Sequence, residues 1–219
     1  MSQKTLVLAG PGEHFGTEVA RRFVKAGFAV ALLARDTARL DRIAHDLKGL
    51  GGTVVLQATD FSDPASVKQS VQECSTRLPP WECCIYNAKS SPRGNISELN
   101  SAELKDSLLV NVVGAYTLAQ LLIQDWDRAE SSSLIITGGG YKDRPASDKL
   151  ALSVGKGAAH SLALSLAAAT SSLGVQTKEI IIDGIVRPEG PLRSSDLADY
   201  YLHVHKDRSD NVVYNFPVG

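Results

Sequence analysis

Three glycines near the start of the chain are the first residues whose type and spacing suggest chemistry. They lie in TLVLAGPGEHFGTEVARRFVKAG, between an apolar run at residues 6–9 and an amphipathic segment at residues 17–25. Glycine tolerates positive φ and close ligand approach, and a helix N-terminus attracts anions. We therefore expect a dinucleotide pyrophosphate site that comprises Gly10, Gly12, His14, Phe15 and Gly16. An ordinary strand, turn and helix without a ligand explains the same glycines.

The elements that must position this turn alternate along the chain. Apolar runs predict strands at residues 6–9, 29–34, 53–58, 82–86, 133–137 and 175–182, and a short edge strand at 211–216. Helical spacing predicts helices between them, including two long ones at 101–126 and 150–173, and another at 197–205. Such alternation requires right-handed crossovers, which give an α/β fold with a doubly wound parallel sheet and helices on both faces. Ligands of such sheets bind beyond the carboxyl ends of the strands.

Composition sets the outer limits. The 219 residues are 43% hydrophobic and carry a formal net charge of -1, so we expect one domain over residues 1–219 and no nucleic-acid partner. No apolar run approaches the roughly 20 residues of a membrane span, and the N-terminus lacks the apolar core of a signal peptide. We predict a soluble, cytoplasmic protein with no membrane partner. Cys74, Cys83 and Cys84 have no metal-ligand spacing and are predicted to be buried, reduced thiols.

With these elements in place, the chain resembles a short-chain dehydrogenase/reductase from Lys4 to about Ile185. The resemblance rests on five elements. It comprises the outer glycines of the turn (Gly10 and Gly16), the acid after the third strand (Asp60), Asn87-Ala88 after the fourth strand, Asn111 in LLVNVVGAYTLA and Lys156 in LSVGKGAAHSLALSLA. It implies a Rossmann fold and a nicotinamide dinucleotide. Asp60 would contact adenine, and its neighbour Phe61 would be a further cofactor-binding residue. Asn111 and Lys156 would belong to the catalytic set, and Gly184 would keep the turn after the sixth strand.

The sequence departs from the family pattern where the proton chemistry belongs. Leu152 stands four residues before Lys156, where the family keeps its tyrosine, and Gly139 stands where it keeps its serine. The family tyrosine protonates the carbonyl oxygen as hydride arrives, and the serine polarises the carbonyl. Proton transfer of this kind contributes about 100-fold to 10,000-fold to the rate, so carbonyl reduction by the usual route should be very slow. Lys156 keeps a simpler role, binding the nicotinamide ribose.

Another group must supply the proton if the protein is an enzyme. Tyr141 is the preferred candidate because it lies in the loop two residues beyond Gly139, whereas Ser153 points about 100° away around the helix. Lys89 and Tyr86 are weaker candidates, and an ordered water or the substrate itself are further sources. His160 is expected to pack or to face solvent. We predict an oxidoreductase acting on a small carbonyl or alcohol. The alternative is a non-catalytic dinucleotide-binding protein, a sensor or structural partner.

The residues after the second strand bear on the choice of cofactor. An NAD site usually has a carboxylate there, but this chain has Ala34 followed by Arg35, with Arg39 one helical turn later. Two guanidinium groups can bind a 2'-phosphate, although Glu13 in the glycine turn opposes this. The sequence favours NADP(H) over NAD(H).

The region after the sixth strand is short for a substrate lid, so we expect the pocket to be open or closed by a partner subunit. In the family the two long helices commonly pair across a two-fold axis. The alanine-rich SLALSLAAA suits such close approach, and we predict a homodimer or homotetramer.

Overall fold

The protein is a three-layered α/β structure around one parallel sheet. The computed structural model describes residues 3–12 and 14–216. Within them, seven strands form one sheet in the order β3-β2-β1-β4-β5-β6-β7, and every neighbouring pair is parallel. The order reverses at β1, which lies between β2 and β4, so the crevice at the carboxyl ends of β1 and β4 is the topological switch point. The predicted doubly wound parallel sheet is confirmed.

The strands agree closely with the apolar runs. They are β1 (Thr5–Ala9), β2 (Ala29–Ala34), β3 (Val54–Ala58), β4 (Trp81–Tyr86), β5 (Arg128–Thr137), β6 (Val175–Ile182) and β7 (Val213–Phe216). The prediction for β5 was too short, because the strand begins at Arg128 with residues of mixed polarity and only its second half is continuously buried. The short edge strand is present as β7, parallel to β6.

The helices begin at recognisable signals. They are α1 (Phe15–Lys25), α2 (Thr37–Gly49), α3 (Pro64–Ser75), α4 (Ser101–Leu108), α5 (Gly114–Asp125), α6 (Leu150–Thr170) and α7 (Ser194–Lys206). Asp36 caps α2 by accepting from the Arg39 N–H, and Asp63 caps α3 with Pro64 as its first residue. Asn100 and Glu103 form a capping box at α4. The last helix, α7, is longer at both ends than predicted.

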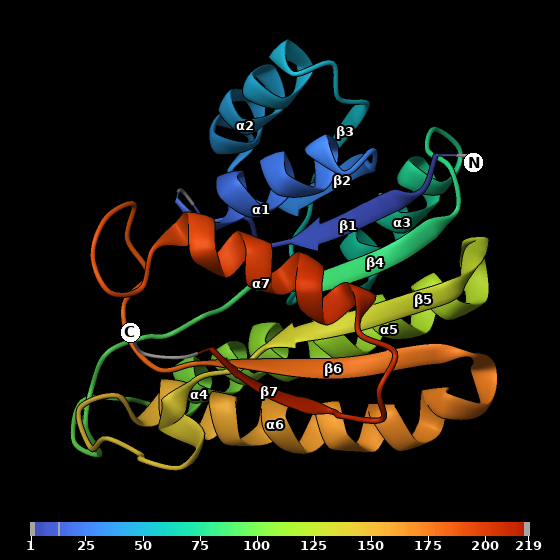
Figure 1. The fold of residues 1–219 in the computed structure, drawn as a ribbon. Coiled ribbons are helices and arrows are strands. Elements are labelled where there is room, and N and C mark those ends of the chain that lie inside the picture. Colours follow the sequence, from blue (N-terminus) through green and yellow to red (C-terminus); the bar gives the residue numbers. More distant parts are fainter. Residues whose placement is uncertain (1–2, 13, 217–219) are drawn as a thin grey trace.

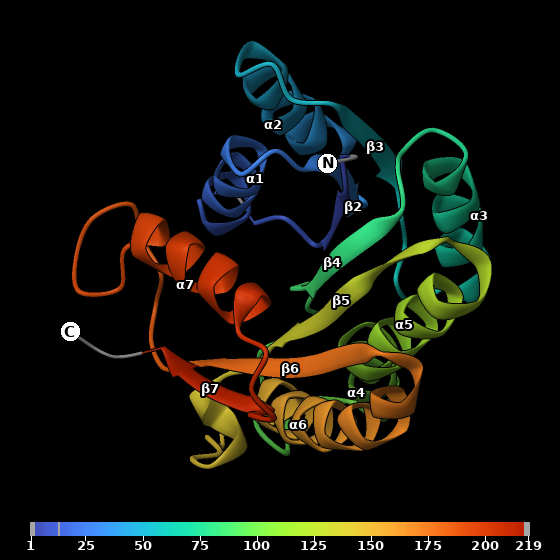
Figure 2. The same ribbon diagram turned by 45° about the vertical axis from the view of Figure 1, so that its right-hand side comes forward.

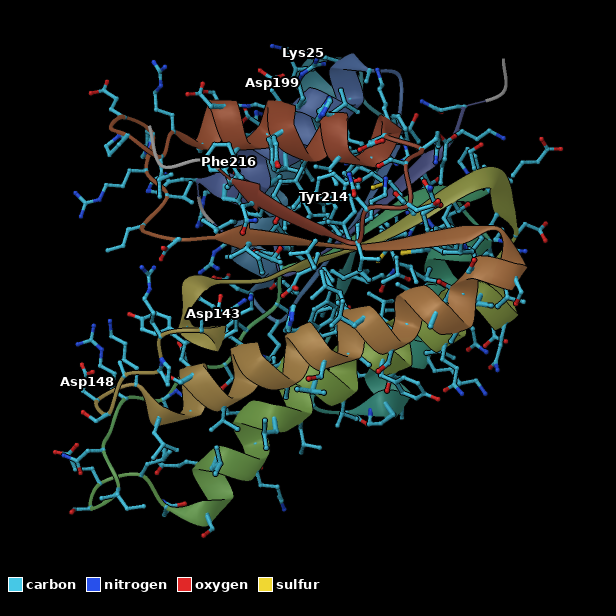
Figure 3. All side chains as sticks on the ribbon, turned by 60° about the horizontal axis from the view of Figure 1, so that its bottom comes forward. Lys25, Asp143, Asp148, Asp199, Tyr214 and Phe216 are labelled. Atoms are coloured by element: carbon cyan, nitrogen blue, oxygen red, sulfur yellow. The ribbon has the colours of Figure 1, made fainter. Side chains whose placement is uncertain are left out.

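Two apolar layers hold the helices to the sheet. Figure 1 shows α1, α2 and α7 on one face and α3, α5 and α6 on the other. The first layer includes Leu8, Phe23 and Tyr201, all fully buried. Figure 3 shows Tyr214 and Phe216 on β7, beneath α7, and both belong to this layer. The second layer is built around Trp81, whose indole N–H donates to the Leu122 carbonyl oxygen at 2.9 Å.

The first long predicted helix is interrupted. A π-helical turn at Leu109–Val113 separates α4 from α5. Figure 2 shows α5 and α6 on the same side of the sheet. Two helical segments, Ser101–Asp125 and Leu150–Leu173, have the length and composition of membrane spans, although neither is an uninterrupted apolar run. Each packs one face against the sheet layer, as helices that cover a sheet also do.

The three cysteines are buried and free, as predicted. Burial raises the pKa of Cys74 and of Cys83 to about 12, so both are neutral thiols near neutral pH.

Candidate functional site

The glycine turn has the geometry of a close backbone approach. Gly10 has φ of +72°, and a Cβ there would lie 2.4 Å from the Ala88 backbone; a Cβ on Gly16 would lie 2.4 Å from Pro11. A side chain at either position is therefore excluded. Gly12, in contrast, faces open space, since nothing lies within 4 Å of a Cβ added there. Two glycines are required by packing, and the third leaves room beside the start of α1.

Two adjoining cavities lie along the carboxyl ends of the strands. The first, of about 500 Å³, is lined by residues that follow β1, β2, β3 and β4; the second, of about 650 Å³, lies beside α6 and the loop that follows β6. Gly12, Asn87 and Lys89 line both cavities. This arrangement fits an extended dinucleotide that crosses the glycine turn with one nucleoside in each cavity. His14 and Phe15 line the second cavity from the α1 side.

Arginine and aspartate side chains surround the first cavity. Arg35 is exposed and makes no hydrogen bond or ion pair with a described residue, whereas Arg39 pairs with Asp36 at 3.0 Å. Of the two guanidinium groups predicted to bind a 2'-phosphate, Arg35 is therefore free and Arg39 is partly engaged by Asp36. The buried Nε of Arg39 has no hydrogen-bond partner among the described residues. Glu13, whose negative charge was predicted to oppose a 2'-phosphate, lies outside the described residues.

Asp60 is held in one orientation at the end of β3. Its Oδ1 accepts from the Ser62 N–H at 2.9 Å and from the Ser62 hydroxyl at 2.7 Å. These hydrogen bonds, helped by the charge of Arg35, lower the pKa of Asp60, so it is ionised near neutral pH. Phe61 is buried against Tyr86, with ring centroids 5.2 Å apart, and lines the same cavity.

The turn after β4 is bonded to the glycine turn. The Asn87 amide donates to the Gly10 carbonyl oxygen at 2.8 Å, and Ala88 packs on Gly10. Tyr86 is directed elsewhere: its buried hydroxyl donates to the Val110 carbonyl oxygen at 2.5 Å, and burial raises its pKa. Tyr86 is thus a structural residue, and its weaker candidacy as proton donor is wrong, because it does not line the second cavity.

Lys156 reaches the second cavity from α6. Its ammonium donates to the Thr137 carbonyl oxygen at 2.6 Å, at the end of β5. Burial, together with the positive charge of Lys89, lowers the pKa of Lys156 to about 8. A Cβ added to Gly139 would lie 3.4 Å from Lys156 Cε, so Gly139 packs directly beside the aliphatic part of the Lys156 side chain. Leu152, one helical turn before Lys156, lines the same cavity.

Asn111 lies behind the cavity wall. It is buried in the π-helical turn, where its Oδ1 accepts from the Ser90 N–H at 2.9 Å and its Nδ2 donates to the Ser90 carbonyl oxygen and the Ser107 hydroxyl. It is not among the residues that line either cavity. In this structure its side chain holds the loop that follows β4.

Tyr141 lines the second cavity and is paired with a lysine that the sequence did not single out. The Lys149 ammonium donates to the Tyr141 hydroxyl oxygen at 2.6 Å and lies 5.1 Å from the centre of its ring. Lys149 immediately precedes α6, and Figure 3 shows Asp143 and Asp148 on the loop before this helix. Ser153 is directed away, donating to the Lys149 carbonyl oxygen. Tyr141 and Lys149 come into contact because the irregular loop before α6 folds back on itself, and the sequence has no periodic pattern that predicts this.

A buried acid lies under the loop that follows β5. Glu179, in the apolar strand β6, is fully buried and contacts His160 Nδ1 at 2.5 Å through Oε2. Its Oε1 has no hydrogen-bond partner among the described residues. A Cβ added to Gly138 would lie only 2.5 Å from this oxygen, so the strand end passes Glu179 at a glycine. His160 therefore has a specific partner rather than simply packing or facing solvent. The signal that could have found this pair is the charge in the middle of VQTKEIII.

The loop after β6 leaves the second cavity open at its rim. Gly184 has φ of +145°, and a Cβ there would meet Leu192 at 2.4 Å, so this turn requires glycine. Asp183 pairs with Arg144 across the rim, and Ile185 is 74% exposed. Within the single chain the cavity is open here, and closure by a partner subunit, the other expectation from the sequence, stays a prediction.

The sheet order, the glycine turn and the paired cavities define a Rossmann-type dinucleotide-binding protein. A family model described as short chain dehydrogenase matches residues 4–189, and the chain belongs to this family. A short-chain dehydrogenase/reductase from Serratia marcescens superposes with a TM-score of 0.86 at 18% identity, covering 99% of this chain and 97% of that one. An alcohol dehydrogenase from Thermococcus sibiricus, complexed with 5-hydroxy-NADP, gives a TM-score of 0.84 at 20% identity, covering 98% and 95%.

Sequence relatives match over shorter stretches. The hydroxy(phenyl)methylsuccinyl-CoA dehydrogenase subunit BbsC of Thauera aromatica is 28% identical over 105 residues, which are 48% of this chain and 42% of the relative. Sepiapterin reductase from Chlorobaculum tepidum is 24% identical over 136 residues, which are 59% of this chain and 56% of the relative. The alignment thus spans about half the length of these two relatives.

Proposed function

We propose that the protein is an NADP(H)-dependent oxidoreductase acting on a carbonyl or alcohol, with Tyr141 as the proton donor. The observation that carries this proposal is the environment of Tyr141: it lines the same cavity as Lys156 and Lys149, and its hydroxyl oxygen accepts a hydrogen bond from the Lys149 ammonium. Because the oxygen is the acceptor, the hydroxyl proton remains available for a substrate oxygen. The nearby cation stabilises the phenolate that forms when this proton leaves.

Leu152 and Gly139 take the places of the family tyrosine and serine in this proposal. Neither can donate a proton or a hydrogen bond from its side chain, so the paired Tyr141 and Lys149 replace them from the loop before α6. Nicotinamide, when bound, supplies or accepts the hydride. Lys156 holds the ribose at the junction of β5 and α6, and Asn111 supports the site by fixing the Ser90 loop.

The preference for NADP(H) rests on the first cavity. Arg35 is available for a 2'-phosphate, and Arg39, which also lines this cavity, adds positive charge despite its pairing with Asp36. An NADP analogue is bound to the similarly folded Thermococcus sibiricus enzyme. The three buried free thiols suit a reducing cytoplasm as the site of action.

The test is NADPH oxidation with a panel of aldehydes and ketones, followed by absorbance. Replacing Tyr141 by Phe should lower kcat by about 100-fold or more, because general acid catalysis contributes at least this much. The control is Tyr116→Phe, at an exposed tyrosine on α5. Unchanged turnover in Tyr141→Phe would exclude Tyr141 as the donor. NADPH binding without turnover of any substrate would instead support the non-catalytic alternative.

A further inference from the structure

The second cavity is strongly cationic. Among the described residues that line it, four carry a positive charge (Lys89, Arg144, Lys149 and Lys156), and Asp183 is the only carboxylate. Asp183 is already paired with Arg144. Three ammonium groups are therefore left without a carboxylate partner inside one cavity, which disfavours a neutral occupant relative to an anionic one.

Two of these three ammonium groups have donors to spare. Lys156 is engaged by the Thr137 carbonyl oxygen and, in the proposed function, by the cofactor ribose. Lys149 uses one of its three N–H donors on Tyr141, and Lys89 is exposed and makes no hydrogen bond or ion pair with a described residue. Lys89 and Lys149 thus approach the cavity from different loops, after β4 and before α6.

The neighbourhood of Lys149 keeps its ammonium at the cavity. The loop after β4 forms a bridge between Gly94 and Lys149, which brings Arg93, another cation, close to the same group. Asp148 is the nearest acid in sequence, but it is exposed and does not line the cavity. Asp148 and Arg93 act on the Lys149 ammonium with opposite signs, so the excess positive charge at the cavity comes from Lys89, Lys149 and Lys156.

Part of the remaining wall is apolar, beside the polar Asn87, Thr137 and Tyr141. Leu152, Ile185 and Val186 line the cavity beside the cations. A ligand that matches this surface has a hydrophobic body with an anionic group at one end.

We propose that the substrate is a carbonyl compound that carries a carboxylate, held by Lys149 and Lys89 while its carbonyl oxygen faces Tyr141. This proposal rests on the proposed function for the reaction, and on the charge distribution of the cavity for the carboxylate. Lys149 then has two tasks, orienting the Tyr141 hydroxyl and binding the anion. A charge-assisted hydrogen bond of this kind is worth about 1.5–3 kcal/mol, which corresponds to about tenfold or more in affinity.

The test separates binding from turnover. The protein, with NADP⁺ present, is titrated calorimetrically with para-acetylbenzoate and with its uncharged analogue para-acetylbenzamide. We expect the carboxylate to bind about tenfold or more tightly than the amide. Lys149→Met and Lys89→Met should each reduce this preference. Lys142→Met should retain it, because Lys142 is paired with Asp143 and does not line the cavity.

The outcomes distinguish the two proposals. Equal affinity for the two ketones, no binding of either, or a preference that survives in both Lys149→Met and Lys89→Met would overturn the anionic substrate class. NADPH-dependent turnover of ketones without this preference would leave the oxidoreductase standing. A clear carboxylate preference without NADPH-dependent turnover of any carbonyl compound would support the anion site and contradict the oxidoreductase.

Discussion

The charge of the Lys156 ammonium depends on pH near neutrality. Burial and the neighbouring Lys89 lower its pKa from 10.5 to about 8 in the folded protein. Between these values the unfolded chain binds more protons than the folded one, so the contribution of this group to stability rises as pH rises through that window. Binding has the opposite sign, because an anionic dinucleotide favours the charged ammonium, which is lost above a pH of about 8.

We therefore predict that NADPH affinity decreases as pH rises through about 8, and that this decrease is flattened in Lys156→Met. The measurement is the Kd for NADPH as a function of pH, with Lys142→Met as the matched control. An affinity that is independent of pH in the wild-type protein between neutral and mildly alkaline pH would show that Lys156 does not titrate at the cofactor.

Individual residues were predictable where a motif fixes them. Gly10, Gly16, Asp60, Asn87 and Lys156 lie where the resemblance placed them, at the ends of their strands or on the expected helix. Lys149 was not predictable, because its contact with Tyr141 depends on the path of an irregular loop. The free Arg35 and the engaged Arg39 also look alike in sequence, since the pairing with Asp36 depends on side-chain geometry.

At the scale of elements, the helical segment of α4 and α5 holds the loop that follows β4. Asn111 in its π-helical turn hydrogen-bonds both backbone groups of Ser90 and the Ser107 hydroxyl. A Cβ on Gly155 would lie 2.6 Å from Asn111 Nδ2, so α6 passes this turn at a glycine. The glycine in LSVGKG therefore has a packing role that apolar periodicity alone cannot show.

Asn111→Ala should lower the free energy of unfolding by about 2 kcal/mol, because it leaves the Ser90 N–H without its acceptor, although the Ser107 hydroxyl still donates to the Ser90 carbonyl oxygen. Urea denaturation measures this loss. Asn95→Ala is the control, since Asn95 caps only an exposed turn through the Ser97 N–H. Equal, small losses in the two variants would show that Asn111 does not hold the loop.

Element boundaries followed the sequence where capping residues or apolar runs mark them, as in α2, α3 and β6. The π-helical turn was missed because its local i→i+5 backbone hydrogen bonds leave the apolar spacing of the surrounding helix almost unchanged. The early start of β5 was missed because its first residues, RAESS, are mostly polar and form no apolar run.

At the scale of the whole molecule, the outer faces of α5 and α6 remain apolar. Tyr116 is 47% exposed and Leu164 is 44% exposed, and Val113 and Val154 are similarly uncovered. These faces belong to the two long helices that the sequence analysis proposed as the pairing surface. We predict a homodimer or homotetramer through these helices, because burying such side chains is favourable.

Sedimentation velocity tests this prediction. The wild-type protein should sediment as a dimer or tetramer, and the double variant Tyr116→Asp, Leu164→Asp should shift toward monomer. The control is Leu50→Asp, at an exposed leucine that follows α2. A monomeric wild-type protein at micromolar concentration would contradict the prediction.

The most direct test of the account is a calorimetric titration of the protein with NADPH and with NADH, repeated on Arg35→Ala. We predict micromolar binding of NADPH, weaker binding of NADH, and loss of about tenfold in NADPH affinity in Arg35→Ala, since a charge-assisted contact to the 2'-phosphate is removed. If neither dinucleotide binds, the two cavities do not form a cofactor site, and the proposed oxidoreductase is wrong.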